Sequence, residues 1–203
     1  MTQAHYEILL ATRSTAKIRE IRQMTADAPI RWRGLDEFPG VPEAPEEEAT
    51  FAGNARSKAF FYARHTGLPT LADDSGLEVD ALDGKPGVNS AYFAGTPRDD
   101  QANNRRLIAE LAGVARERRT ARYRCVMVFV DAGRVLFETT GSMEGLIMDE
   151  PRGAGGFGYD PYFFVPACGR TAAELSAEEK NAISHRGHAL RDALRWLQRL
   201  AGS

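Results

Sequence analysis

The stretch YRCVMVFV, residues 123–130, decides the fold class, because its run of β-branched and aromatic residues is the strongest strand signal in the chain. The turn formers at residues 131–133, Asp-Ala-Gly, follow at once, so residues 134–140 are predicted to return as the second strand of a hairpin. Elsewhere, strand and helix patterns alternate along the chain. The sequence therefore predicts an α/β fold with at least one antiparallel hairpin in a mixed sheet.

On the N-terminal side, a predicted strand at residues 6–11 leads through a tight loop into a helix. Residues 29–45 are rich in Pro and Gly and are expected to be irregular. Thr50 is the predicted N-cap of the next helix. A short buried strand is expected at residues 68–72, ending at the pair Asp73-Asp74.

On the C-terminal side, residues 151–158 form a predicted glycine-rich loop. Ser176 and Glu179 make a capping box for a further helix, and a last helix is expected over residues 186–200. No internal repeat and no linker interrupts the chain. We therefore expect one domain over residues 1–203.

Composition restricts the function classes. The 203 residues are 43% hydrophobic and 27% charged, as in ordinary globular proteins. Lys and Arg total 26 against 28 Asp and Glu, so the chain has no net positive charge that would attract the phosphates of a nucleic acid. No apolar run approaches the roughly 18–20 residues of a membrane span, and residues 1–5 lack a signal-peptide pattern. Cys125 and Cys168 cannot make a disulfide framework. A cytoplasmic protein without nucleic-acid or membrane partners is expected.

Residues 12–17, Thr-Arg-Ser-Thr-Ala-Lys, stand where the first strand meets the first helix. Free backbone N–H groups and the helix dipole allow such a junction to bind phosphate. The hydroxyl groups and the two cations of this segment favour phosphate binding further. The glycines of a P-loop are missing. An ordinary capped helix with a solvated lysine is the alternative.

Asp73 and Asp74 are predicted at the end of a buried strand, where ligands of α/β sheets bind. Adjacent carboxylates suit a hard divalent cation such as Mg²⁺. Residues 46–48 supply three more carboxylates ahead of a helix. The alternatives are a solvent-facing aspartate turn and a solvated acidic helix N-terminus.

Two further segments concentrate groups that can bind a ligand. Residues 153–161 combine permissive glycines with two aromatic rings and an acid, and an exposed ring can stack on a base. Residues 180–186 place several hydrogen-bond donors within two helical turns. Aromatic rings packed into the core and an ordinary histidine are the alternatives.

Taken together, these segments resemble one known family. The strings LADDSGL at residues 71–77, GGFGYDP at 155–161 and EKNAISHRG at 179–187 carry the match, in order, with further motifs from about Ile8 to Leu190. The chain resembles the inosine/xanthosine triphosphate pyrophosphatases, which act on deaminated purine nucleotides such as ITP, dITP and XTP.

The resemblance implies an elongated mixed β-sheet flanked by helices, with two lobes and a central nucleotide-binding cleft. It implies hydrolysis of a nucleoside triphosphate to the monophosphate and pyrophosphate, with Mg²⁺ as cofactor, in a homodimer. Asp74 would be the general base and a metal ligand, and Glu46 the second metal ligand. The substrate-binding residues implied are Thr12, Arg13, Ser14, Thr15, Ala16, Lys17, Lys58, Ser75, Phe157, Gly158, Tyr159, Asp160, Lys180, His185 and Arg186.

Departures from the family pattern bear on details of the site. Ser14 stands where the family usually has Asn, and Arg13 stands where it often has Gly. Which of Glu46, Glu47 and Glu48 reaches the metal stays open. Two other functions are kept: a pyrophosphatase for other modified nucleotides, pyrimidines included, and a nucleotide sensor that binds without turnover. The pair Asp73-Asp74 and Lys17 favour an enzyme over a sensor.

Overall fold

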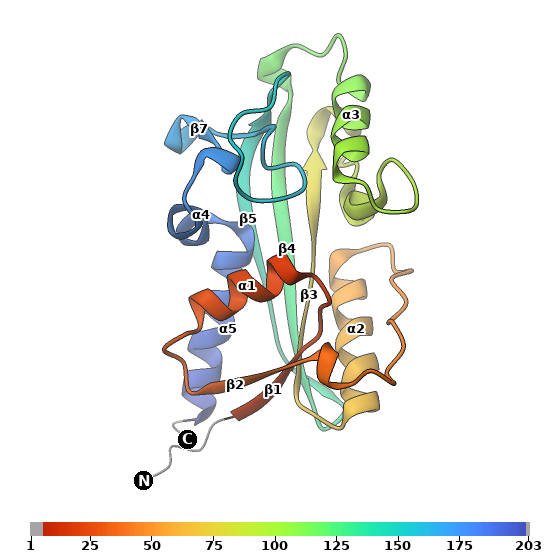
Figure 1. The fold of residues 1–203 in the computed structure, drawn as a ribbon, viewed down its shortest axis with the longest axis vertical. Helices are drawn as coiled ribbons and strands as arrows, with labels where there is room; N and C mark the ends of the chain where they lie inside the picture. Colours follow the sequence, from red (N-terminus) through yellow and green to blue (C-terminus); the bar gives the residue numbers. More distant parts are fainter. Residues whose placement is uncertain (1–5, 202–203) are drawn as a thin grey trace. The chain divides into compact units, whose positions relative to one another are not determined.

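The structure is a computed structural model that describes residues 6–201, and of residues 200 and 201 only the backbone. Residues 1–5, where we looked for a signal peptide, lie outside the described residues. Figure 1 shows the elements in order of sequence. The strands are β1 (Tyr6–Leu10), β2 (Ile30–Gly34), β3 (Thr70–Val79), β4 (Thr120–Asp131), β5 (Arg134–Ile147), β6 (Phe163–Val165) and β7 (Arg170–Thr171). The helices are α1 (Thr15–Met24), α2 (Phe51–Thr66), α3 (Asp100–Glu110), α4 (Ala177–Ile183) and α5 (His185–Ala201).

The strands form one seven-stranded sheet in the order β2-β1-β3-β4-β5-β6-β7. β1 pairs in parallel with β2 and β3, whereas β5 with β6 and β6 with β7 are antiparallel. Ala132 and Gly133 both have positive φ and connect β4 to β5 as a two-residue hairpin turn. The predicted α/β fold with a mixed sheet and a hairpin is confirmed.

The chain divides into two compact units, neither of which is continuous in sequence. Within the described residues, unit 1 comprises residues 6–74, 125–140 and 188–201, and unit 2 comprises residues 75–124 and 141–187. Because the chain passes between the units within β3, β4, β5 and α5, no linker marks a boundary in the sequence.

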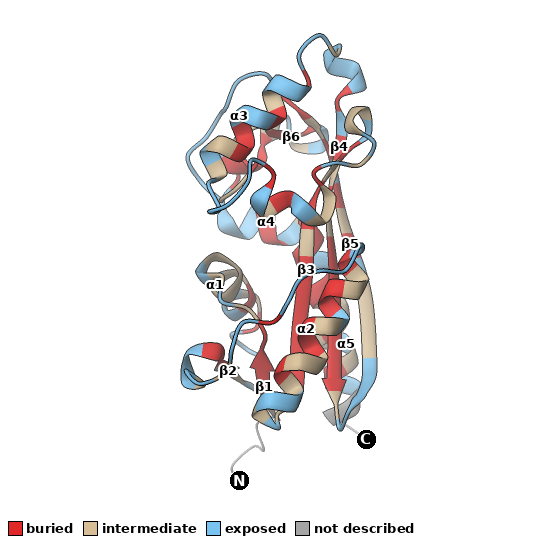
Figure 2. Cartoon of the chain, turned by 90° about the vertical axis from the view of Figure 1, so that its right-hand side faces the viewer, coloured by how far each residue is buried: buried red, intermediate tan, exposed pale blue. Residues whose placement is uncertain are grey.

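In unit 1, alternate residues of the strands are buried under helices. Ile8 and Leu10 of β1 pack with Leu71 of β3, Ile21 of α1 and Leu190 of α5 in one cluster. The strand residues between them point to the other face and are buried as well, so both faces of this part of the sheet are covered, as the red strands of Figure 2 show. Such two-sided burial is typical of parallel strands.

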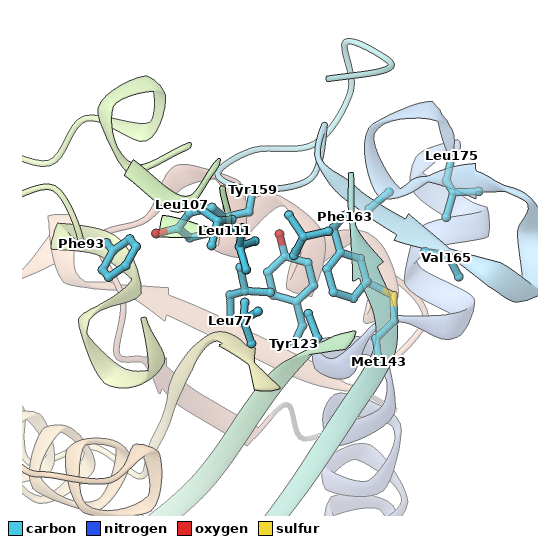
Figure 3. Packing of buried hydrophobic residues seen from close by; sticks show 14 residues of the cluster. Leu77, Phe93, Leu107, Leu111, Tyr123, Met143, Tyr159, Phe163, Val165 and Leu175 are labelled. Atoms are coloured by element: carbon cyan, nitrogen blue, oxygen red, sulfur yellow. The ribbon is translucent and has the colours of Figure 1, made fainter. Parts of the chain in front are cut away.

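In unit 2, a separate core is built around aromatic rings (Figure 3). Tyr123 of β4 lies against Phe163 of β6, with 4.5 Å between the ring centroids. Leu107 and Leu111 of the α3 region are fully buried in the same cluster. This core gives the loops of unit 2 a rigid base.

Two expectations about strands were wrong. Residues 30–34 form β2 rather than irregular chain, because parallel pairing with β1 satisfies their backbone groups. Residues 73–76 continue β3 to Val79 rather than ending a strand at Ala72. Within the described part of the chain, no helix combines the length and the apolar character needed to cross a membrane.

Candidate active site

Asp73 and Asp74 lie inside β3 and not after it. Successive side chains of a strand point to opposite faces of a sheet, so these neighbours in sequence have separate surroundings. Asp73 forms an ion pair with Lys17 of α1, with 2.8 Å between Oδ2 and Nζ. Asp74 instead contacts α2, where Asn54 Nδ2 donates to its Oδ2 at 3.1 Å. The expectation that the pair closes a strand is wrong, and each carboxylate has its own partners.

The Asp74 carboxylate is buried beside a lysine of α2. Its residue is 6% exposed, and Nζ of Lys58 lies 3.6 Å from Oδ1. Burial raises the pKa of Asp74 above its ordinary value, and the positive charges of Lys58 and Lys17 only partly oppose this. Burial lowers the pKa of Lys58, but the charges of Asp74, Asp73 and Glu46 outweigh it and leave that pKa raised. Asp74 is therefore a more basic carboxylate than usual, next to a charged ammonium.

Glu46 joins this cluster from the loop before α2. Its Oε1 accepts a hydrogen bond from Nζ of Lys58 at 2.6 Å, while its side chain keeps 46% exposure. Glu48 contributes its backbone N–H, which donates to Oδ1 of Asn54 at 3.0 Å. These contacts favour Glu46 among the three consecutive glutamates as the second carboxylate of the site.

The donor set fits a hard divalent cation in part. A cation, the Lys58 ammonium, already lies between the carboxylates of Glu46 and Asp74. Mg²⁺ prefers carboxylate oxygens and usually completes its shell with waters and substrate phosphates. Among residues 6–201, no group of three or more His, Cys, Asp or Glu side chains is placed to hold a metal. Glu46 and Asp74 would thus supply only two carboxylates to such a cation, and the rest of its shell would come from water or phosphate.

Residues 12–17 span the junction of β1 and α1, as predicted, and residues 15–17 are the first residues of the helix. Ser14 is the N-cap, and its hydroxyl accepts from the backbone N–H of Lys17 at 3.4 Å. The Thr12 hydroxyl accepts from the N–H of Ser14 at 3.2 Å. Ser14 thus holds the helix start in place, where the helix dipole and Lys17 favour an anion.

The other residues of this turn differ in their surroundings. Arg13 is exposed and donates to the backbone carbonyl of Val41 at 3.0 Å, so it fastens the loop before α2. Thr15 is exposed and Ala16 is half-buried on the first turn of α1. Their binding of phosphate stays a prediction.

In unit 2, a buried ion pair organises a second polar cluster. Nζ of Lys180 lies 2.6 Å from Oδ2 of Asp160, and the two residues are 6% and 2% exposed. The same Oδ2 accepts the backbone N–H of Phe157 at 2.8 Å. Gly156 has a φ of +70°, and a Cβ there would clash with the Asp160 carboxylate. Asp160 therefore positions both the glycine-rich loop and Lys180.

Two cations lie over the ring of Phe157. Nζ of Lys180 is 4.8 Å from the ring centroid, and the guanidinium carbon of Arg186 is 5.9 Å from it. Arg186 also donates from Nη2 to the hydroxyl of Ser75 at 2.9 Å. These contacts join four residues that the sequence placed in the site although they are far apart in the chain.

His185 is held by an aromatic stack. Its ring lies parallel to that of Tyr123, with 4.9 Å between centroids and 15° between planes. The Tyr123 hydroxyl donates to Asp160, and burial together with that carboxylate raises the pKa of Tyr123 well above its ordinary value. Tyr123 therefore connects His185 to Asp160.

Tyr159 and Gly158 are engaged with the protein. The Tyr159 hydroxyl donates to the carbonyl of Ser90 at 2.8 Å, and its ring belongs to the core of unit 2. The Gly158 carbonyl accepts from Nδ2 of Asn104 at 2.9 Å. The side chain of Tyr159 is thus a packing element under the glycine-rich loop.

The structure brings most predicted site residues together within the units. In unit 1, Asp73 pairs with Lys17 on one face of β3, and Asp74 lies with Lys58 and Glu46 on the other. In unit 2, one cluster contains Ser75, Phe157, Asp160, Lys180, His185 and Arg186. Asn54 and Tyr123 were not among the predicted site residues. Asn54 precedes Lys58 by four residues on one helix, which is a detectable signal, whereas Tyr123 sits in an ordinary strand pattern.

The mixed sheet flanked by helices, with buried lysine–carboxylate pairs beside it, places the chain in the class of α/β proteins with a charged polar site. The particular family follows from comparison with known proteins. The chain belongs to the Ham1 family, whose family model matches residues 8–196.

Three similar proteins cover almost the whole chain. A curated dITP/XTP pyrophosphatase of Geobacter sulfurreducens is 50% identical over 192 residues, covering 93% of this chain and 96% of its own. The solved structure of a HAM1 protein from Coxiella burnetii is 41% identical in sequence, with a TM-score of 0.88. The match covers 96% of this chain and 99% of that chain. The crystal structure of a nucleoside-triphosphatase / dITP/XTP pyrophosphatase from Mycobacterium abscessus is 41% identical in sequence, with a TM-score of 0.76. The match covers 94% of this chain and 99% of that chain. The family resemblance predicted from the motifs is confirmed.

Proposed function

We propose that this protein hydrolyses non-standard purine nucleoside triphosphates, ITP, dITP and XTP, to the monophosphate and pyrophosphate. Such a reaction removes deaminated purines from the nucleotide pool. Membership of the Ham1 family and relatives named dITP/XTP pyrophosphatase support the proposal. The structural observation that carries it is the buried Asp74 carboxylate beside Lys58 and Glu46.

The chemical step needs a base and positive charge. A water oxygen forms a bond to phosphorus, the P–O bond between the α and β phosphates breaks, and pyrophosphate leaves. Asp74 is proposed to orient this water and accept its proton, for which burial, by raising its pKa, makes it better suited than an ordinary aspartate. Lys17 and Lys58 are proposed to stabilise the negative charge on the departing pyrophosphate.

Mg²⁺ is the cofactor we propose, held by Glu46 and Asp74. When bound, it would supply charge neutralisation of phosphate oxygens and an acidified water. The carboxylates of these two residues flank a single cation, the Lys58 ammonium, which supports their assignment.

Selectivity for the base is assigned to unit 2. Inosine and xanthosine carry a hydrogen-bond acceptor at position 6, where adenine carries an amino donor. His185 and Arg186 are proposed to donate to this acceptor, so that ATP would place a donor against a donor. Sites built on matched hydrogen bonds reject such analogues strongly. Exclusion of guanine, which shares the 6-oxo group, must depend on its 2-amino group.

Pyrophosphate release from a panel of nucleotides, with and without Mg²⁺, tests the proposal. The expected result is a kcat/KM for ITP, dITP and XTP far above those for ATP and GTP, and only with the metal present. Preference for modified pyrimidine nucleotides would support the first alternative kept above. Tight nucleotide binding without pyrophosphate release would instead support a sensor.

A homodimer and a cytoplasmic location are part of the same proposal. Both rest on the family resemblance and on the sequence composition. Light scattering on the purified chain tests the dimer, and a mass of one chain at assay concentrations would exclude it.

A further inference from the structure

Asn54 is a buried amide with both of its ends engaged. It is 2% exposed, at the fourth position of α2. Its Oδ1 accepts the backbone N–H of Glu48 at 3.0 Å, and its Nδ2 donates to Oδ2 of Asp74 at 3.1 Å. One side chain therefore joins the loop that carries Glu46 to the strand that carries Asp74.

The chemistry of these partners leaves the amide one orientation. A backbone N–H can only donate, so the amide oxygen must face Glu48. The amide nitrogen then necessarily faces Asp74, whose carboxylate accepts. Turning the amide over would set two donors against each other at Glu48 and two acceptors against each other at Asp74, both in buried surroundings.

This orientation distinguishes the two oxygens of Asp74. Oδ2 is engaged by Asn54, while Oδ1 is the oxygen 3.6 Å from Nζ of Lys58. Lys58 in turn contacts Glu46 at 2.6 Å. Rotation of the carboxylate about its Cβ–Cγ bond out of its present plane would break the Asn54 hydrogen bond, so this bond fixes the plane of the group and with it the position of the oxygen near Lys58.

We infer that Asn54 is a positioning residue of the proposed active site, which holds the plane of the Asp74 carboxylate so that the oxygen not bonded to Asn54 faces Lys58. It acts through Asp74 and through the Glu46–Glu48 loop and need not touch the substrate. The inference rests on the proposed function for its effect on turnover, but its effect on metal binding can be measured separately.

Unit 2 provides a matched control residue, Asn103. It is also 2% exposed and also at the fourth position of a helix, α3. Its Oδ1 accepts the N–H of Ala94 at 2.7 Å, and its Nδ2 donates to the carbonyl of Ala91 at 2.9 Å. Asn103 thus resembles Asn54 in burial and bonding, but its donor meets backbone and not a carboxylate of the site.

The test compares Asn54→Leu with Asn103→Leu, each of which removes a buried amide. Asn54→Leu is expected to lower kcat for dITP by roughly 10- to 100-fold, as happens when a group supporting a ligand or base is removed, with KM changed less than about threefold. Mn²⁺ binding to the nucleotide-free protein, followed by electron paramagnetic resonance, should weaken by a similar factor. Asn103→Leu should leave kcat and Mn²⁺ binding unchanged below its unfolding temperature.

If Asn54→Leu does not fold, the same kcat and Mn²⁺ measurements are made on Asn54→Ser, whose smaller side chain removes the same contacts without overpacking. The inference is overturned if the folded Asn54 variant keeps wild-type kcat and Mn²⁺ affinity, or if Asn103→Leu loses both to the same extent. If wild-type protein releases no pyrophosphate, the proposed function fails, while Mn²⁺ binding still tests Asn54.

Discussion

Nζ of Lys58 lies 2.6 Å from Oε1 of Glu46, so a lysine cation joins the loop before α2 to the cluster around Asp74. The two carboxylates flanking this ammonium are those that we propose as metal ligands. A divalent cation bound there would therefore compete with the ammonium for the same oxygens. In the proposed reaction, metal binding would displace Lys58 from these carboxylates and leave its charge for a substrate phosphate.

Lys58→Met is expected to tighten Mn²⁺ binding in the absence of nucleotide while lowering turnover of dITP. Two unit charges about 4 Å apart interact by about 1 kcal/mol even at the dielectric constant of water, so at least about a fivefold gain in affinity is expected. Titration calorimetry measures it. The control Lys17→Met removes the same charge from a pair with Asp73 and should give a smaller gain. Equal gains would show that only overall charge matters.

Asp74→Asn tests the proposed base. The substitution keeps the shape of a side chain that is 6% exposed, so the fold should persist. Loss of a proton acceptor is expected to reduce kcat for dITP by roughly 10²- to 10⁴-fold. Pyrophosphate release measures the rate and circular dichroism the fold. Near-normal turnover with Mg²⁺ present would remove Asp74 from this role.

The buried pair Asp160–Lys180 should show strong coupling in a double-mutant cycle. Removing one partner of a buried ion pair leaves a buried charge and typically costs about 3–5 kcal/mol. Asp160→Asn and Lys180→Met are each expected to lower the free energy of unfolding substantially, and the double variant to lose less than their sum. Urea unfolding of the four proteins measures this. Additive losses would mean that the 2.6 Å contact contributes little.

Gly156→Ala is expected to destabilise the glycine-rich loop more than Gly158→Ala. Both glycines have positive φ, which costs an L-residue roughly 1–2 kcal/mol. Only at Gly156 would the added Cβ also clash with the Asp160 carboxylate, and such overpacking costs about 1–3 kcal/mol more. Thermal unfolding of the two variants provides the comparison. Equal losses would argue against close contact between this loop and Asp160.

Tyr123 should make stability fall at alkaline pH. Its pKa is raised above the unfolded-state value near 10, so its contribution is fully present below about pH 10 and is lost as the pH rises toward the folded-state pKa. Tyr123→Phe should therefore remove up to about 1.4 kcal/mol of this loss per pH unit above 10. Urea unfolding at pH 9 to 11 measures the slope. An unchanged slope in Tyr123→Phe would contradict this role of the Tyr123 hydroxyl.

Several parts of the fold and site were predictable from local patterns. The hairpin of β4 and β5, the turn of residues 12–17 into α1 and the capping box of Ser176 and Glu179 depend on residues close together in the chain. The motifs around Asp74, Phe157 and His185 likewise identified the family. β2 escaped prediction because its stability comes from pairing with β1 and not from its own short sequence.

By itself, the sequence determined the β4–β5 hairpin, the helices with clear caps and the family to which the chain belongs. Only the tertiary structure decided the partners of each charge: Asp73 with Lys17 of one helix, Asp74 with Asn54 and Lys58 of another. The physical reason is the alternation of a strand. It turns two adjacent carboxylates to opposite faces of the sheet, and what covers each face depends on how distant segments pack.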